Sequence, residues 1–229
     1  MRYHFFILFF SLLFTACQNA ETGRTNASEE RLFFDYQVSG EEGQENATVR
    51  LQYKLGDENG EAMALEKPAK VLLDGEEIAA DSSRFMGTYY ELIRPVDALK
   101  GRHSIVFVDE KGKEYRQDFS FEPFTLAEEL PEKVQKRPFS IRLQNVSPAA
   151  GTVRLVMTDT SLYSAGVNEE LQVENGEIRV NDTMLDRLTT GPVSLQRSHE
   201  KEVPIHQGSK ADGRLLLTYS LRRQFELVR

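Results

Sequence analysis

The only thiol in the chain belongs to Cys17, and its position is the strongest chemical signal in the sequence. It follows an apolar run from Phe5 to Phe14, which is itself preceded by the basic residue Arg2. A lone thiol can be modified covalently, but it has no second cysteine with which to form a disulfide or a thiolate metal site. The apolar run is about half of the 20 residues or so that a permanent membrane span needs. Residues 1–16 therefore have the form of an export signal.

The residues Phe14-Thr15-Ala16-Cys17 resemble the lipobox of bacterial lipoproteins. The resemblance implies that residues 1–16 are removed and that Cys17 becomes an acylated N-terminus, which anchors the protein to a membrane. That family prefers leucine three residues before the cysteine, where this chain has Phe14. Its sorting rule, applied to Gln18, implies the outer membrane and leaves the periplasmic and cell-surface faces both open. The alternative is an ordinary signal peptide that happens to contain a cysteine.

Histidines and carboxylates are the next candidates for chemistry, and their spacing favours no metal site. His199 and His206 are seven residues apart, with Glu200 and Glu202 between them, but Pro204 interrupts the segment and no H-E-x-x-H motif occurs. A charged loop or strand edge is the better explanation of this segment. We therefore predict no metal ligands here.

Other catalytic or calcium-binding patterns are equally weak. Residues 57–61 are acidic but lack the twelve-residue calcium register, so a polar hairpin tip is the simpler interpretation. Serines such as Ser161, Ser164 and Ser198 lie in no G-x-S-x-G or S-x-x-K motif. We predict a protein that is not an enzyme and has no cofactor. An enzyme whose site is assembled from scattered carboxylates is a further alternative.

The charge of the chain limits its partners. The formal net charge is −8, and it becomes −9 when Arg2 is removed with the signal. Binding of nucleic acid needs a clustered basic face, so we expect no nucleic-acid partner. An acidic surface is common in exported soluble proteins and indicates solubility more than function.

From Arg31 onward the hydrophobic period is 2, which predicts half-buried strands and an all-β protein. Asp74-Gly75 and Asn175-Gly176 match the two-residue turns of β-hairpins. In the first half we expect strands near 31–38, 48–55, 69–73, 76–79, 84–93, 102–108 and 114–121. Such a series of short alternating strands is typical of an immunoglobulin-like antiparallel β-sandwich.

A proline-containing connector separates the two halves, and period 2 resumes at Phe139 and lasts to the end of the chain. The predicted organisation is a signal peptide (1–16), a lipidated tether (17–30), a first immunoglobulin-like sandwich (31–123), a linker (124–138) and a second β-sandwich (139–229). A polar tether of this length has a typical end-to-end distance of about 20 Å.

The stretch Leu99-Lys100-Gly101-Arg102-His103 resembles bacterial immunoglobulin-like domains, in which a leucine and a glycine precede an aromatic residue at the start of the penultimate strand. His103 stands where that aromatic residue would be. Asp109 and Gly112 resemble the hairpin between the last two strands of the same family. The resemblance implies a fold and does not imply a ligand.

Taken together, these patterns predict a lipid-anchored envelope protein that acts as a binding or spacer module. An envelope protein partner would meet its loops or an exposed strand edge, because antiparallel sheets offer edge pairing. The alternative is an accessory glycan-binding lipoprotein of a polysaccharide-uptake system, with Tyr163 as a sugar-stacking residue. Asp182-Thr183-Met184 resembles the short O-glycosylation motif that Bacteroidetes use on exported proteins, and this motif has meaning only if the chain is a lipoprotein of that phylum.

Overall fold

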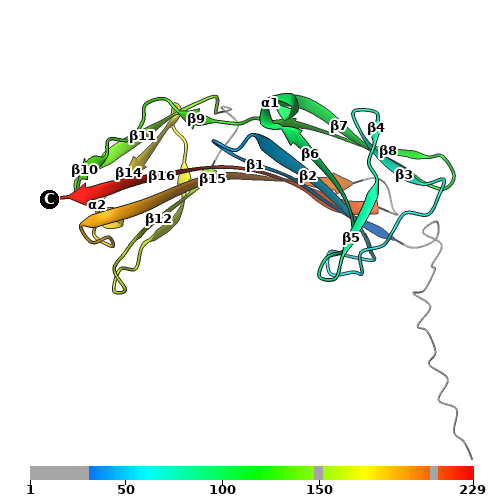
Figure 1. The fold of residues 1–229 in the computed structure, drawn as a ribbon, viewed down its shortest axis with the longest axis horizontal. Coiled ribbons are helices and arrows are strands. Elements are labelled where there is room, and N and C mark those ends of the chain that lie inside the picture. Colours follow the sequence, from blue (N-terminus) through cyan, green and yellow to red (C-terminus); the bar gives the residue numbers. More distant parts are fainter. Residues whose placement is uncertain (1–30, 147–151, 207–210) are drawn as a thin grey trace, which may run out of the picture.

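The computed structural model describes residues 31–146, 152–206 and 211–229 of the chain. Within these ranges the protein is built of β-strands, together with two helices of one turn each. Figure 1 shows an elongated arch that has a lobe at each end and two long strands running through both lobes. The predicted signal (1–16) and the predicted tether (17–30), including Cys17, lie outside the described residues, so the lipid anchor stays a prediction.

The first lobe confirms the period-2 prediction for the first half of the chain. Its elements are β1 (Leu32–Glu41), β2 (Asn46–Leu55), β3 (Lys70–Leu73), β4 (Glu76–Glu77), β5 (Ala80–Ser83), β6 (Gly87–Pro95), α1 (Val96–Leu99), β7 (Gly101–Val108) and β8 (Glu114–Phe121). The strand expected at 84–93 begins only at Gly87. No sequence pattern predicts β5, because this polar strand lies at the edge of its sheet and is mostly exposed.

The second lobe is also made of short strands. Its elements are β9 (Thr125–Leu126), β10 (Lys133–Gln135), β11 (Phe139–Gln144), β12 (Thr152–Asp159), β13 (Val167–Gln172), β14 (Glu177–Val180) and α2 (Asp182–Leu185). The turn at Asn175-Gly176 has the positive φ angles that its sequence predicts, 54° and 77°. The expected hairpin closes around this turn with one antiparallel bridge, in which Glu174 and Glu177 exchange backbone hydrogen bonds of 3.0 Å and 2.9 Å. It does not extend further, since β13 pairs with β12 in the large sheet while β14 pairs with β11 in another sheet.

The last two strands belong to both lobes. β15 (Gly191–His206) and β16 (Ala211–Val228) form one long antiparallel hairpin, which we call the shared hairpin. One end of it pairs with β12 and β10 of the second lobe. At the other end β16 runs parallel to β1 of the first lobe, in register from Leu32↔Ala211 to Glu41↔Ser220. A single sheet therefore extends from β13 to β5 through the whole arch.

The parallel pairing of β1 with β16 depends on a glycine. A Cβ atom at Gly213 would collide with the backbone carbonyl oxygen and the side chain of Phe34 on β1. Only a residue without a side chain lets the two strands approach at this point.

In the first lobe the large sheet stacks on the four-stranded sheet β4-β3-β7-β8. The rings of Phe34 and Tyr53 lie 5.4 Å and 4.9 Å from the ring of Phe107, which comes from the opposite sheet. The hydroxyl groups of Tyr36 and Tyr53 are 3.1 Å apart in the same core, and burial raises the pKa of Tyr36 above its ordinary value. The first lobe is thus a β-sandwich with an aromatic core.

The shared hairpin contributes to both cores with side chains of one parity. Leu215 and Leu217 are buried at the end that meets β1, and Phe225 and Leu227 are buried in the second lobe. This continuous parity is what the sequence predicts for the last strand. The predicted linker, 124–138, contains β9 and β10, which pair with β11 and β16. The division into a first domain at 31–123 and a second at 139–229 stays a prediction, and its test is given in the Discussion.

Candidate functional site

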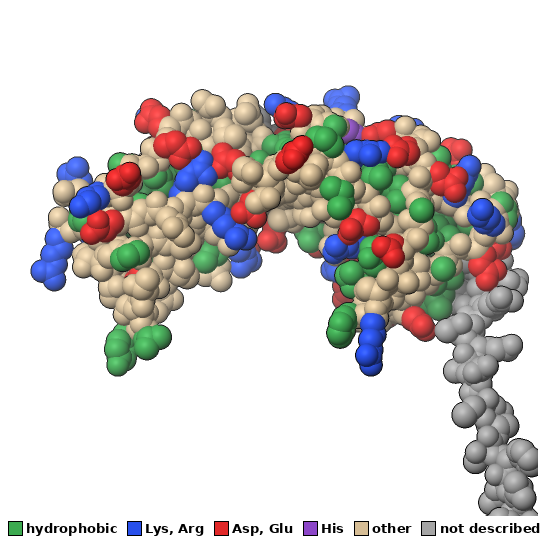
Figure 2. Space-filling model, viewed as in Figure 1, with side chains coloured by type: hydrophobic (Ala, Val, Ile, Leu, Met, Phe, Trp, Pro, Cys, Tyr) green, Lys and Arg blue, Asp and Glu red, His purple; other side chains and the backbone are tan. Residues whose placement is uncertain are grey.

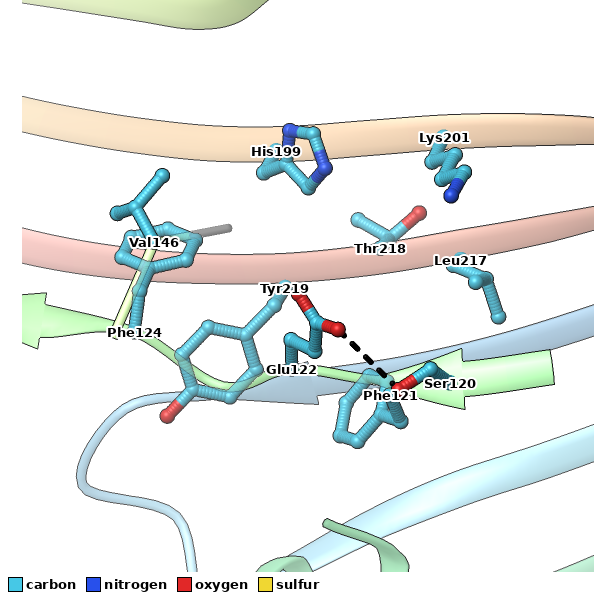
Figure 3. A pocket seen from close by; sticks show the side chains of 10 residues that line it. All are labelled: Ser120, Phe121, Glu122, Phe124, Val146, His199, Lys201, Leu217, Thr218 and Tyr219. Atoms are coloured by element: carbon cyan, nitrogen blue, oxygen red, sulfur yellow. Dashed lines mark hydrogen bonds between the residues drawn. The ribbon is translucent and has the colours of Figure 1, made fainter. Parts of the chain in front are cut away.

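A small pocket lies where the two lobes meet, and Figure 3 shows the side chains that line it. Its cavity measures about 70 Å³. Apolar surface comes from Phe121, Phe124, Val146, Leu217 and Tyr219, and polar groups come from Ser120, Glu122, His199, Lys201 and Thr218. These residues belong to β8, to the two segments that follow β8 and β11, and to the shared hairpin. The pocket therefore exists only because the shared hairpin crosses the end of the first lobe.

The volume of the pocket limits what it can hold. A water molecule occupies about 30 Å³ in the liquid, and pockets for drug-sized ligands measure about 300–1,000 Å³. A cavity of about 70 Å³ is too small for a metabolite of ordinary size. It fits one protruding side chain or a small group, with an apolar wall on one side and hydrogen-bonding groups on the other.

The aromatic wall of the pocket is tightly packed. The ring of Tyr219 stands edge-on to Phe124 and Phe121, with centroid separations of 5.1 Å and 5.9 Å. Beneath it, a Cβ atom at Gly40 would lie 3.1 Å from Phe121 and 3.2 Å from Tyr219. Such close contacts hold the rings in place, so this wall is formed before any partner arrives.

Three residue types used in nucleophilic catalysis occur in the pocket, but they are not arranged as a triad. The Ser120 hydroxyl donates directly to the Glu122 carboxylate at 3.2 Å, and His199 Nδ1 lies 3.2 Å from the carbonyl oxygen of Thr152. In a triad the imidazole stands between the hydroxyl and the carboxylate. Within the described ranges no hydrogen bond joins Ser120 to His199.

Arg197 lies directly behind the aromatic wall. Its side chain is fully buried on β15, between Leu155 and Leu221 of the neighbouring strands. Among the residues that the structure describes, none forms a hydrogen bond with its Nε, Nη1 or Nη2 atom, and the guanidinium lies 4.1 Å from the ring centroid of Phe124. Burial lowers the pKa of Arg197 to about 9, so this group is charged at neutral pH. The period-2 parity that it shares with Val193 and Leu195 is the sequence signal that could have placed it in the core.

Replacing Arg197 by methionine should stabilise the protein. A cation–π contact contributes about 2 kcal/mol when it is desolvated, whereas burying an unpaired ion costs several kcal/mol. Methionine has a similar length and no charge, so we expect the free energy of unfolding to rise by about 1–4 kcal/mol. Urea denaturation of the Arg197→Met variant measures this change.

The matched control for this prediction is Arg154→Met on the neighbouring strand β12. Arg154 is exposed and pairs with Glu170 at 3.2 Å, so its replacement should change stability by less than about 1 kcal/mol. A loss of stability in the Arg197→Met variant would contradict the prediction.

An ion-pair network closes the joint between the lobes. Arg223 of β16 donates to both carboxylate oxygens of Glu129, at 2.6 Å and 2.8 Å, and to Glu42 at 2.5 Å. Hydrogen bonds to these carboxylates raise the pKa of Arg223. Glu42 follows β1, and Glu129 lies in the predicted linker, so one guanidinium connects the first lobe, the linker and the shared hairpin.

The histidines considered from sequence do not converge. His199 and His206 differ in parity and leave opposite faces of β15. His206 Nδ1 lies 3.5 Å from Asp212, at the far end of the shared hairpin. In the part of the chain that the structure describes, no cluster of three or more histidine, cysteine or acidic side chains is placed to hold a metal ion.

The acidic segment 57–61 forms a turn after β2. The Asp57 carboxylate accepts a hydrogen bond from the backbone N–H of Asn59 at 2.8 Å. Glu58 lies 3.4 Å from Arg214, and its carbonyl oxygen accepts a hydrogen bond from Lys54 at 3.0 Å. These groups stabilise the turn that follows β2 and link it to β16.

The tyrosines occupy different environments. Tyr90 is buried and its hydroxyl accepts from the backbone N–H of Leu65, whereas the Tyr89 hydroxyl donates to Asp81 on the other face of β6. Tyr163 is 99% exposed in the turn between β12 and β13. In the three-residue motif, Thr183 is exposed on α2 and Met184 is buried.

No protein-family model and no curated protein matches the sequence. Among solved structures, the tandem Ig repeats of Dlar share 7% identity over 84% of this chain and 100% of theirs, with a TM-score of 0.24. The IG1+IG2 structure of DIP-gamma shares 10% identity over 82% of this chain and 97% of that one, with a TM-score of 0.25. The adhesin InvE of Yersinia pseudotuberculosis shares 13% identity over 84% of this chain and 61% of its own, with a TM-score of 0.22. At these scores the likeness adds nothing to what the strand pairing shows.

No helix in the ranges 31–146, 152–206 and 211–229 has both the length and the apolar composition needed to cross a bilayer.

Proposed function

We propose that this chain is a lipid-anchored protein of a bacterial cell envelope, attached through Cys17 to the outer membrane, that binds or spaces a protein partner without catalysis. The observation that best supports this proposal is the shared hairpin, which makes one continuous sheet of both lobes. A frame of this kind holds its two ends at a fixed separation. The pocket at its joint has room for a single side chain of a partner.

The anchor is tested by changing the one thiol. Expressed in a Gram-negative host, the full chain should be found in the outer-membrane fraction, and its N-terminal peptide should carry the mass of an acylated Cys17. The Cys17→Ser variant should lose the acyl mass and leave the membrane fraction, because no other cysteine can take the lipid. An unmodified Cys17 thiol in the mature wild-type protein would overturn the anchor.

The partner is tested with a photo-crosslinking amino acid placed at Lys201, an exposed residue on the rim of the pocket. We expect a discrete crosslinked product with an envelope protein in intact cells. The matched control is the same amino acid at Lys111, which is exposed in the turn between β7 and β8 and lies outside the pocket. Equal crosslinking at both positions would argue against a protein partner at the joint.

Glycan binding is the second candidate, and the exposure of Tyr163 is the observation that favours it. A sugar ring stacks on a flat aromatic face that is open to solvent, and this ring is open on all sides. A glycan array would show binding that is lost in the Tyr163→Ala variant. The absence of any bound glycan on the array would remove this candidate and leave the protein-binding function standing.

A further inference from the structure

Large apolar side chains are exposed at two separate turns of the arch. Phe85 and Met86, at the turn between β5 and β6, are 97% and 38% exposed. Leu162 and Tyr163, at the turn between β12 and β13, are 97% and 99% exposed. We call the turns at residues 84–86 and 161–164 the first and second foot. Surface residues of this size and exposure, grouped in pairs, indicate a contact surface.

The two feet come from opposite lobes and project from the same side of the arch. In Figure 1 both turns extend downward from the long sheet, on its concave side. Figure 2 shows hydrophobic side chains at the end of each of these two projections. A flat surface laid against the concave side would meet both feet at once.

Residues 84–86 and 161–164 themselves contain no carboxylate, although the chain as a whole is acidic. Carboxylates do lie nearby, since Glu58 and Glu61 line a pocket with Phe85 and Met86, and Asp159 accepts a hydrogen bond from the N–H of Ser161 at 2.8 Å. Charged residues make up 28% of the sequence and its net charge is −8. Residues 82–88 carry one charge, that of Arg84, and residues 160–168 carry none. The tips themselves thus present apolar and aromatic side chains with one basic residue, which are side chains that the interface of a lipid bilayer accepts.

Side chains of the protein also hydrogen-bond to several backbone polar groups of the feet, which lowers the cost of moving these groups into a medium that is poor in water. In the first foot, the Ser83 hydroxyl accepts from the N–H of Met86, and Gln52 donates to the carbonyl oxygen of Met86 at 2.7 Å. In the second, serine hydroxyls accept from the N–H groups of Tyr163 and Gly166, at 3.3 Å and 3.2 Å.

The shape of the feet favours lipid over a protein surface as the occupant. Protein hot spots lie at the centres of well-packed patches that a rim of other residues shields from water. Each foot is instead the tip of a projecting turn, where Phe85, Leu162 and Tyr163 are almost fully exposed. A projecting apolar tip becomes buried when it enters the headgroup region of a lipid bilayer, where aromatic residues are common in membrane proteins.

We infer that the two feet insert into the headgroup region of a membrane, so that the arch stands on the bilayer with its concave side toward the lipid. This inference rests on the proposed anchoring at Cys17, which brings the body within reach of the bilayer. An anchor at one residue does not by itself determine which side of the body faces the bilayer. Two inserted feet would fix the orientation of the arch and present its convex side to a partner.

The chain contains no tryptophan, so a single introduced tryptophan is the only source of indole fluorescence in each variant. We would prepare Phe85→Trp and Tyr163→Trp in the full acylated chain and reconstitute each into phosphatidylcholine vesicles with brominated acyl chains. The control is Ala98→Trp, an exposed position on α1, at the upper edge of the arch in Figure 1. Mass spectrometry of Cys17 in the same samples separates a failure of the anchor from a failure of the feet.

With Cys17 acylated, we expect the tryptophan emission of both foot variants to shift to shorter wavelength and to be quenched by bromine. The emission of the Ala98→Trp control should neither shift nor be quenched. The shift should persist in high salt, because apolar insertion is not screened by ions. Full solvent exposure of either foot in the vesicle-bound protein would overturn the inference. A shift that appears only after an envelope protein is added would assign the feet to a protein partner instead, and it would equally overturn lipid insertion.

Discussion

A chain that ends at residue 138 will not form a stable first lobe. It keeps β1 to β8 but lacks the shared hairpin, and β1 then loses its pairing with β16 along its whole length. The buried side chains Leu215 and Leu217 are lost from the core as well, as is Tyr219 at the joint. Full burial of each such side chain contributes about 1.5–3 kcal/mol, and a typical domain is stable by only about 5–15 kcal/mol. We expect loss of cooperative unfolding and of a dispersed amide spectrum.

The control is the full chain, whose calorimetric unfolding should be a single transition, because both lobes share β15 and β16. A well-dispersed spectrum from the isolated segment 31–138 would show instead that the first lobe folds independently, as the division at 124–138 predicts. The experiment therefore decides between two autonomous domains and one unit with two lobes.

Removing the carboxylate of Asp35 should have the next largest effect. Asp35 lies on β1 and is 3% exposed; it accepts hydrogen bonds from Lys54 of β2 at 2.7 Å and Arg214 of β16 at 3.1 Å. Breaking a buried ion pair costs about 3–5 kcal/mol. Since both cations reach solvent in part, we expect Asp35→Ala to cost about 3 kcal/mol in urea denaturation, at the low end of that range.

The matched control is Asp118→Ala, which removes an exposed pair with Arg116 and should change stability by less than about 1 kcal/mol. A similar small effect at Asp35 would show that its two cations contribute little to holding β1 between β2 and β16.

The Asp35 cluster also predicts a dependence of stability on pH. Burial alone raises the pKa of Asp35, but the hydrogen bonds and charges of Arg214 and Lys54 outweigh it, and the pKa lies below its ordinary value of 3.8. The unfolded chain therefore binds a proton at this position before the folded protein does. The stabilisation is complete well above pH 3.8 and is lost as the pH falls through the lower pKa of the folded state.

This pH dependence is measured as the difference in unfolding free energy between wild type and Asp35→Asn. The asparagine has the same shape but no charge. We expect the difference to be constant near neutral pH and to shrink under acidic conditions. A difference that does not vary down to the acid transition would contradict a lowered pKa.

Much of the local structure could be predicted from the sequence. The alternation of apolar and polar residues from Val49 to Leu55 predicts β2, and the parity of Leu215 to Leu227 predicts β16 as one strand. This prediction is possible because side chains alternate between the two faces of a strand. A half-buried strand therefore has apolar residues at every second position of its sequence. β5 has no such period, because both of its faces are largely exposed.

The choice of strand partners could not be read from the same pattern. The turn at Asn175-Gly176 forms as its sequence predicts, yet β13 and β14 pair in different sheets. Turn residues determine backbone angles over two positions, whereas pairing depends on contacts between residues far apart in the chain. For the same reason, the pairing of β1 with β16 and the pocket beside it could not be predicted from the sequence.

By itself, the sequence determined that the body of the chain is made of β-strands and that Cys17 is its one candidate for lipidation, since side-chain period and a lone thiol are local properties. Only the tertiary structure decided that the guanidinium of Arg197 packs on the ring of Phe124, that one hairpin serves two lobes, and that two apolar turns 77 residues apart (Phe85 to Leu162) lie on the same side of an arch. These features arise from the packing of distant segments, which no local pattern records.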